Sequence, residues 1–252
     1  MHKPSHNQVV RSLQIINHVL AALGITYIWL TLQWSWLWIA VLTYWLIGVI
    51  GINIGMHRLL SHRSFVTTLW LERLFSVIGV LTTVGSPLAW VAIHRQHHRA
   101  AETTQDPHSP FQIGNFRAWF GIWPKIKLDA KLIRDLRQDK FQRSLHRYYF
   151  WIILSWIAVL SVAGGPLAVI FVYSVPACLC LHSTSAIIVI AHRHGYRSHQ
   201  CRDQSRNSWI ANLITLGEGW HNNHHARPWA WNNWERWWEV DIPSIIIRMV
   251  KK

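Results

Sequence analysis

Histidine is concentrated in three short segments of this 252-residue chain. His57 and His62 lie five positions apart, and two later segments read HRQHH, from residue 94, and HNNHH, from residue 221. Residues three and four apart are neighbours on a helix surface, so the pattern H-x-x-H-H turns its histidines toward one side. Each segment therefore predicts two or three imidazoles that point at a common centre.

The ligand type indicates which metal such a centre would hold. Imidazole suits iron, copper and zinc, whereas magnesium and calcium prefer oxygen ligands. Three clusters hold more nitrogen ligands than one ion needs, so two transition-metal ions are expected. Histidines outside the clusters are expected to be ordinary hydrogen-bonding residues; these are His2, His6, His18, His108, His146, His182 and His199.

The elements that must position these clusters are predicted to be membrane helices. No Lys, Arg, Asp or Glu occurs in residues 12–56 or 148–191, and each stretch is long enough for two spans of about 20 residues. Gly164, Gly165 and Pro166 mark a reversal in the second stretch. The prediction is an all-α integral-membrane fold, a single domain over 1–252, with spans near 13–32, 36–55, 149–163 and 167–191.

The distribution of positive charge predicts the orientation of these spans. All 25 Lys and Arg lie outside the uncharged stretches, so the positive-inside rule places both termini and the central segment in the cytoplasm. The histidine clusters then belong to a cytoplasmic helical cap formed by 57–147 and 192–252. Within it, residues 69–90 predict a helix that lies in the membrane interface or dips into it.

The formal net charge of +14 indicates which kinds of partner the chain would bind. The basic helical stretch Lys125 to Arg147 is typical of a solvated face or of contact with anionic membrane lipid. A docking site for an acidic redox protein or an anionic acyl carrier is the sharper alternative. Nucleic-acid binding is not expected, because no recognised motif accompanies the charge.

The motifs resemble, in order and spacing, those of the integral-membrane fatty acid desaturases of the Δ9 type, which are related to the stearoyl-CoA desaturases. The resemblance covers roughly Gly55 to the end of the chain and fits the four-span hydropathy. It rests on HRLLSHRSF from 57, WVAIHRQHH from 90 with DPH from 106, AHRHGYR from 191, and DQSRNSWIANLITLGEGWHNNHHARP from 203.

The resemblance implies an enzyme with two iron ions (Fe2+) that uses O2 and two electrons to place a cis double bond in a saturated acyl chain. It implies no catalytic residues apart from the metal ligands. The ligands that it implies are His57, His62, His94, His97, His98, His192, His221, His224 and His225.

The chain departs from the family pattern at one position. The family usually has an asparagine four residues before its isolated histidine, here His192, and this chain has Ile188. Coordination is then completed differently, by an open or water-filled position, or the activity is altered. His194, two residues after His192, is a candidate to replace the contact that the asparagine makes.

Other residues are assigned supporting roles. Neighbouring methylenes differ only in position, so a narrow tunnel must select the bond; by resemblance Trp90 and Thr184 line it, and Ser185 stands where the animal enzymes have tryptophan. Asp106 and Glu218 are expected to orient imidazoles by accepting their second N–H.

The resemblance also implies partners. The acyl substrate is carried on CoA, on a carrier protein or on a lipid. Electrons are expected from a separate donor such as ferredoxin or cytochrome b5, because the sequence has no haem, iron–sulfur or dinucleotide motif.

Two other functions stay open at this point. One is a hydroxylase or ketolase on the same di-iron scaffold, in which oxygen is transferred to carbon. The other is a non-catalytic membrane metal-binding homologue, which the intact histidine clusters disfavour and Ile188 keeps open.

Overall fold

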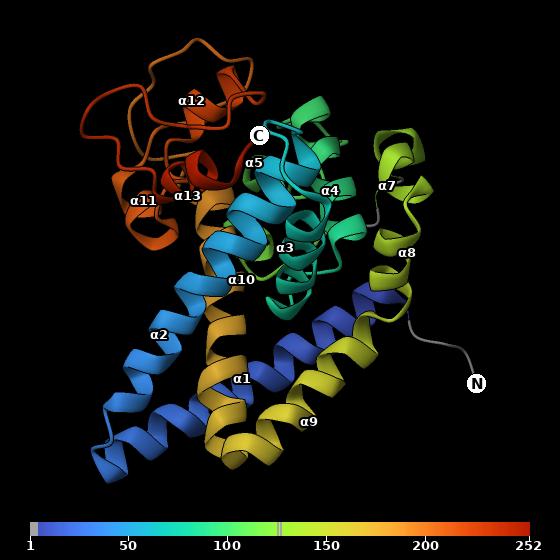
Figure 1. The fold of residues 1–252 in the computed structure, drawn as a ribbon. Helices are drawn as coiled ribbons and strands as arrows, with labels where there is room; N and C mark the ends of the chain where they lie inside the picture. Colours follow the sequence, from blue (N-terminus) through green and yellow to red (C-terminus); the bar gives the residue numbers. More distant parts are fainter. Residues whose placement is uncertain (1–4, 125, 127) are drawn as a thin grey trace.

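The computed structural model describes residues 5–124, 126 and 128–252, and within these residues every regular element is a helix (Figure 1). The all-α prediction is therefore confirmed for the described part. Lys125 and Lys127, at the start of the predicted basic stretch, lie outside the described residues.

Three continuous helical stretches are long and apolar enough to cross a membrane. The first is α1 (His6–Thr31). The second, Ser35–Ser61, consists of α2 (Ser35–Ile47) and its continuation η1 (Gly48–Ser61). With a rise of about 1.5 Å per residue, each exceeds the hydrocarbon thickness of about 30 Å.

The third stretch, Tyr149–Val189, has 41 residues and contains a break. It comprises α9 (Tyr149–Ala168), η3 (Val169–Ser174) and α10 (Val175–Val189). Gly165 leaves the helical conformation, with φ 66° and ψ −162°, which glycine adopts readily because it lacks a Cβ. Figure 1 shows α9 running away from the cap and α10 returning to it, so the chain reverses where the Gly-Gly-Pro sequence predicts.

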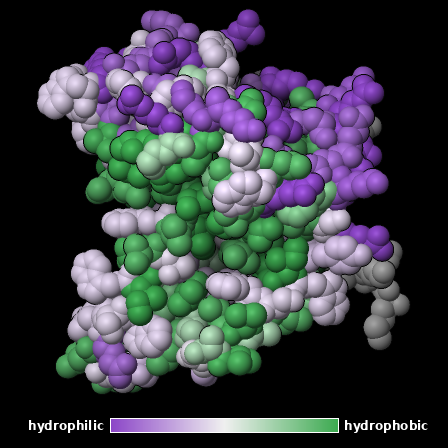
Figure 2. Space-filling view, viewed as in Figure 1, coloured by the Kyte–Doolittle hydropathy of each residue, from purple (hydrophilic) through white to green (hydrophobic). Residues whose placement is uncertain are grey.

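The long helices form an apolar stem below a polar cap. Figure 2 shows hydrophobic residues over the part of this face that holds the long helices, and hydrophilic residues gathered above it. Large apolar side chains on the stem face outward, with Leu30 80% exposed, Trp38 72% and Val162 91%. Exposed apolar surface on this scale is expected of helices that contact lipid.

The cap is built from short helices. The expectation of one helix over 69–90 is wrong, because the chain turns between α3 and α4: Thr83 has φ 59°, and Ser86 caps the next helix by accepting a hydrogen bond from the Ala89 N–H. The cap elements are α3 (Leu69–Leu81), α4 (Pro87–Ala100), α5 (Pro110–Ile113), α6 (Asn115–Trp119), η2 (Ala130–Ile133), α7 (Arg134–Gln138), α8 (Lys140–Arg147), α11 (Trp209–Thr215), α12 (His221–Ala226) and α13 (Ile242–Val250).

Glycines allow η1 to approach α3 closely. A Cβ added to Gly51 would lie 2.8 Å from the Gly79 nitrogen and 2.9 Å from the Ile78 carbonyl carbon. Small residues at a helix interface let two backbones come together in this way. The contact fixes η1, which carries the first histidine cluster, against the cap.

We expect Gly51→Ala to destabilise the protein by about 1–3 kcal/mol, the usual cost of overpacking, because its methyl group meets backbone that cannot move aside. Gly48→Ala on the same helix is the matched control, since its nearest neighbour would be a Tyr44 ring atom at 3.5 Å. Thermal unfolding in detergent measures the difference, and equal melting temperatures for the two variants would contradict this account of the interface.

Candidate metal centre

The first two histidines are brought together by an unusual helix. η1 is a π-helix, in which the N–H of one residue bonds the carbonyl five positions earlier, and the His62 N–H donates to the His57 carbonyl at 3.1 Å. In an α-helix, residues five apart point roughly 140° away from each other. Here the two ring centroids are 4.9 Å apart, so the spacing H-x4-H fits the π-helix.

The predicted ligands form two groups, and the first contains five histidines. Their ring nitrogens all lie within 4.8 Å of one another. The Nε2 atoms of His57 and His224 are 3.1 Å apart, and those of His62 and His94 are 2.7 Å apart. His98 Nε2 lies 3.1 Å from His224 Nε2, so η1, α4 and α12 supply one cluster.

The second group contains the other four histidines. His97, His192, His221 and His225 also place ring nitrogens within 4.8 Å of one another. The Nε2 atoms of His221 and His192 are 3.2 Å apart, and His192 follows the end of α10. The structure thus brings together all nine histidines that the sequence singles out, five in one group and four in the other.

Burial keeps these imidazoles neutral. It lowers the pKa of His62, His94, His98 and His224 well below the ordinary value. Burial likewise lowers the pKa of His225 to about 4, although the neighbouring Asp203 opposes the shift. A neutral imidazole keeps one nitrogen lone pair, so at neutral pH each of these rings has a lone pair for a metal.

Both carboxylates that the sequence singles out contact ligand histidines. Glu218 Oε2 lies 2.8 Å from His57 Nδ1, and Asp106 Oδ2 lies 2.9 Å from His97 Nδ1. Burial alone would raise the pKa of Glu218, but the nearby Arg58 and His57 bring it down to about 2. An ionised carboxylate only accepts, so both Nδ1 atoms donate and each Nε2 is left on the side away from its carboxylate.

Two further carboxylates, which the sequence analysis does not identify, also contact histidines of the second group. Glu102 Oε1 lies 3.1 Å from His192 Nδ1, and Asp203 Oδ2 lies 2.7 Å from His225 Nδ1. The separations in sequence, 90 residues for Glu102 and His192 and 22 for Asp203 and His225, do not predict these pairs. The available signal is scarcity: with 11 Asp and Glu in the whole chain, each acidic residue near a histidine cluster is a candidate partner.

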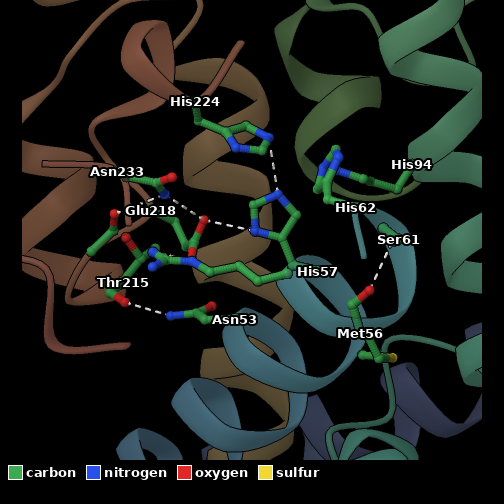
Figure 3. Close-up of polar contacts among 12 residues, drawn as sticks. Asn53, Met56, His57, Ser61, His62, His94, Thr215, Glu218, His224 and Asn233 are labelled. Atoms are coloured by element: carbon green, nitrogen blue, oxygen red, sulfur yellow. Dashed lines mark hydrogen bonds and ion pairs between the residues drawn. The ribbon is translucent and has the colours of Figure 1, made fainter. Parts of the chain in front are cut away.

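A third residue that the sequence analysis does not identify, Arg58, binds Glu218 on the side away from His57. Its guanidinium is 1% exposed and donates to Glu218 Oε1 at 2.8 Å and to Asp241 Oδ1 at 2.9 Å. Figure 3 shows His57 between Glu218 on one side and His224 on the other. Asp241, Arg58, Glu218 and His57 therefore form a continuous polar chain that ends in the first histidine group.

The donor set fits metal ions. With Nδ1 of His225 bonded to Asp203, its Nε2 is buried without a hydrogen-bond partner. The Nε2 atoms of His57 and His192 lie 3.1 Å and 3.2 Å from the Nε2 atoms of His224 and His221. Converging nitrogen lone pairs in a buried space are the arrangement that a transition-metal ion stabilises.

A cavity adjoins both groups and contains the predicted tunnel residues. Trp90, Thr184 and Ser185 all line it, together with histidines of each group. Trp90 stacks on His94 with ring centroids 4.8 Å apart. The Ser185 hydroxyl donates to the Trp119 carbonyl at 2.6 Å, so it also joins α10 to α6.

Three positions near the histidine groups, Ile188, His194 and His108, call for separate description. Ile188 is 7% exposed and lines the cavity near His192, so it offers an apolar side chain beside the four-histidine group. His194 is exposed and belongs to neither group, so it does not replace a ligand. His108, expected to be an ordinary residue, lies with His97 and Asp106 in a third cluster.

Comparison with known proteins agrees with this geometry. The family model for fatty acid desaturase matches residues 34–243. The sn-1 stearoyl-lipid 9-desaturase of Synechocystis sp. is 36% identical over 225 residues, which cover 86% of this chain and 70% of that protein. The sn-2 palmitoyl-lipid 9-desaturase of Nostoc sp. is 37% identical over 87% of this chain and 79% of its own length. The Acyl-CoA 5-desaturase of Anemone leveillei is 30% identical over 88% and 70%. The chain therefore belongs to the fatty acid desaturase family.

Proposed function

We propose that this chain introduces a cis double bond, at the Δ9 position, into a saturated acyl chain at a centre of two iron ions. The observation that carries the proposal is the pair of buried histidine groups beside a largely apolar cavity. The five histidines of the first group would hold one ion and the four of the second group the other.

The reaction removes one hydrogen from each of two adjacent methylenes. These two hydrogens, two electrons and two protons reduce one O2 to two molecules of water, and the carbon–carbon bond becomes double. Bound iron supplies the activation of O2 that this step needs, since no side chain in water can deprotonate an unactivated methylene.

The residues of this protein would bind the acyl chain and position it. Apolar residues of α10, including Leu181 and Ile187, line the cavity and would hold the acyl chain away from water. Trp90, fixed against His94, forms a rigid wall next to the first histidine group. Fixing one pair of methylenes near the metals is how geometry selects among chemically equal positions.

We propose four membrane crossings, with the break at Gly165 dividing the third apolar stretch into two. Both ends of this stretch adjoin the cap in Figure 1, and the positive-inside rule assigns the cap and both termini to the cytoplasm. The 9-desaturase relatives are named for stearoyl- and palmitoyl-lipid substrates. A lipid-linked acyl chain is therefore the proposed substrate, and CoA or a carrier protein is the alternative.

The electrons are proposed to come from a separate acidic protein, a ferredoxin or a cytochrome b5. The net charge of +14 favours an acidic partner, because complementary charge steers the encounter of two proteins.

The first test is the fatty-acid profile of cells that express this chain with ferredoxin and its reductase, measured by gas chromatography with mass spectrometry. We expect a new 9-monounsaturated chain, absent from cells that express His97→Ala, because that variant removes a ligand from the four-histidine group. His199→Ala is the control, since His199 bonds Glu235 outside both groups. A hydroxy acid would favour oxygen transfer, and an active His97→Ala protein would refute the ligand assignment.

We expect Asp203→Asn to lower iron affinity about 10–100-fold, the usual effect of removing a group that orients a ligand. The asparagine loses the charge that holds His225 Nδ1–H. Glu235→Gln is the control, because it changes a carboxylate–histidine pair away from the centre. Iron retained after dialysis against a chelator is the measurement, and equal retention in the two variants would remove Asp203 from the centre.

We expect Thr184→Leu to shift products toward shorter chains, because the larger side chain narrows the cavity. Thr26→Leu is the control: both threonines donate to the carbonyl four positions earlier, but Thr26 is exposed on α1. Thr184 is a cleaner position than Ser185, whose hydroxyl also joins α6 to α10. The product-chain distribution is the readout, and identical distributions would exclude Thr184 from the substrate path.

A further inference from the structure

A second hollow opens on the outer side of His192. It has a volume of about 360 Å³ and is lined by Arg193, His194 and Arg206 together with the amide side chains of Asn115 and Gln204. It lies between the α5–α6 segment and the chain that follows α10. None of these five residues belongs to the histidine groups of the metal centre.

The two guanidinium groups in this hollow have no carboxylate partner. Among the described residues, neither Arg193 nor Arg206 forms an ion pair with Asp or Glu. Arg193 lies 4.5 Å from the centre of the Phe111 ring. Arg206 donates to the Gly195 carbonyl at 3.3 Å, and its Nε is buried without a partner.

A structural role alone does not account for both arginines. Arg193 follows the C-terminal end of α10, where a cation is stabilised by the helix dipole. Arg206 comes from a different segment, and its bond to the Gly195 carbonyl leaves its Nε without a partner. Two unpaired guanidiniums that line one concave space indicate a missing anion, because guanidinium donors match phosphate oxygens in pairs.

The surroundings indicate where the anion comes from. Phe111, which lines the hollow, is 43% exposed, and Phe116, next to Asn115 in the chain, is 68% exposed. Exposed aromatic residues on short helices next to a cationic site are typical of a surface that lies in the membrane interface. Lipid head groups occupy that depth.

We propose that this hollow binds the phosphate of an anionic lipid head group. The two guanidiniums would contact the phosphate oxygens, Asn115 and Gln204 would donate to the remaining head-group oxygens, and the exposed phenylalanines would lie against the acyl region. The site goes beyond the proposed reaction, since its occupancy requires neither iron nor turnover.

The test is lipid binding to the purified full chain in detergent, followed by native mass spectrometry during titration with phosphatidylglycerol, phosphatidylcholine or inorganic phosphate. We expect Arg193→Gln/Arg206→Gln to weaken phosphatidylglycerol binding at least about tenfold, from the loss of charge-assisted hydrogen bonds. Binding of phosphatidylcholine should not change. Arg202→Gln/Arg248→Gln is the control, because it removes two exposed charges that lie outside both the hollow and the basic stretch from Lys125 to Arg147.

Several outcomes would overturn the proposal. One is unchanged phosphatidylglycerol binding by the Arg193→Gln/Arg206→Gln variant, and another is an equal loss in the Arg202→Gln/Arg248→Gln control. Inorganic phosphate that binds as tightly as the lipid would make the ligand a soluble anion. Unchanged lipid binding with a raised KM for the electron donor would make the hollow a protein-docking site.

If the double glutamine variant does not fold, Arg193→Lys/Arg206→Lys keeps the test open. It retains the charge but loses the paired donors, so it should bind phosphatidylglycerol less tightly than the wild type. Binding equal to that of the wild type would contradict the proposed contacts. The lipid-binding measurements are made without turnover, so failure of the proposed desaturase reaction would not alter them.

Discussion

Nine imidazoles buried side by side impose the constraint on which the cap depends. Each ring is most useful to a metal when its inward nitrogen has a lone pair, and its outward N–H then needs an acceptor. Glu218, Asp106, Glu102 and Asp203 provide four such acceptors. Their negative charge in a buried space is costly unless it is paired, and Arg58 shows one solution, because it is shared between Glu218 and Asp241. Outward from His57, donors and acceptors therefore alternate: the imidazole donates to Glu218, and Arg58 donates to Glu218 and to Asp241.

Two kinds of helix carry the histidines of the two groups. On α4 the spacing of three and four residues places its histidines on one side, as an α-helix requires. On η1 the spacing is five, and the i→i+5 bonding of a π-helix meets it. The glycine contact between η1 and α3 holds this wider helix in place. The fold therefore adapts its helical repeat to the ligand spacing in each segment.

The local parts of this arrangement are predictable from the sequence, and the long-range parts are not. The nine histidines, the apolar stretches and the break at Gly165 follow from residue type and spacing, and Asp106 contacts a histidine nine residues away. Glu218, Glu102 and Asp203 contact histidines of other segments through the folded chain, so their nearness to a cluster makes them candidates without giving the partner of each. Arg58 and Asp241 have no sequence signal at all. The turn between α3 and α4 was missed because apolar composition continues through it while the backbone changes at Thr83. Whether the nine histidines hold iron, and whether Thr184 and Ser185 touch substrate, stay predictions.

The polar chain from Asp241 through Arg58 to His57 joins a residue of η1 to residues that follow α10 in the sequence. Arg58 is synthesised before α9 and α10, whereas Glu218 and Asp241 follow them. Domains form progressively from the N-terminal side during synthesis, so Arg58 must wait in the unfinished protein as an unpaired charge close to the membrane. Only after the later helices have inserted and the last segment has emerged can its two carboxylates arrive. Both histidine groups contain residues that follow α10, so a chain interrupted within the stem would leave both groups incomplete.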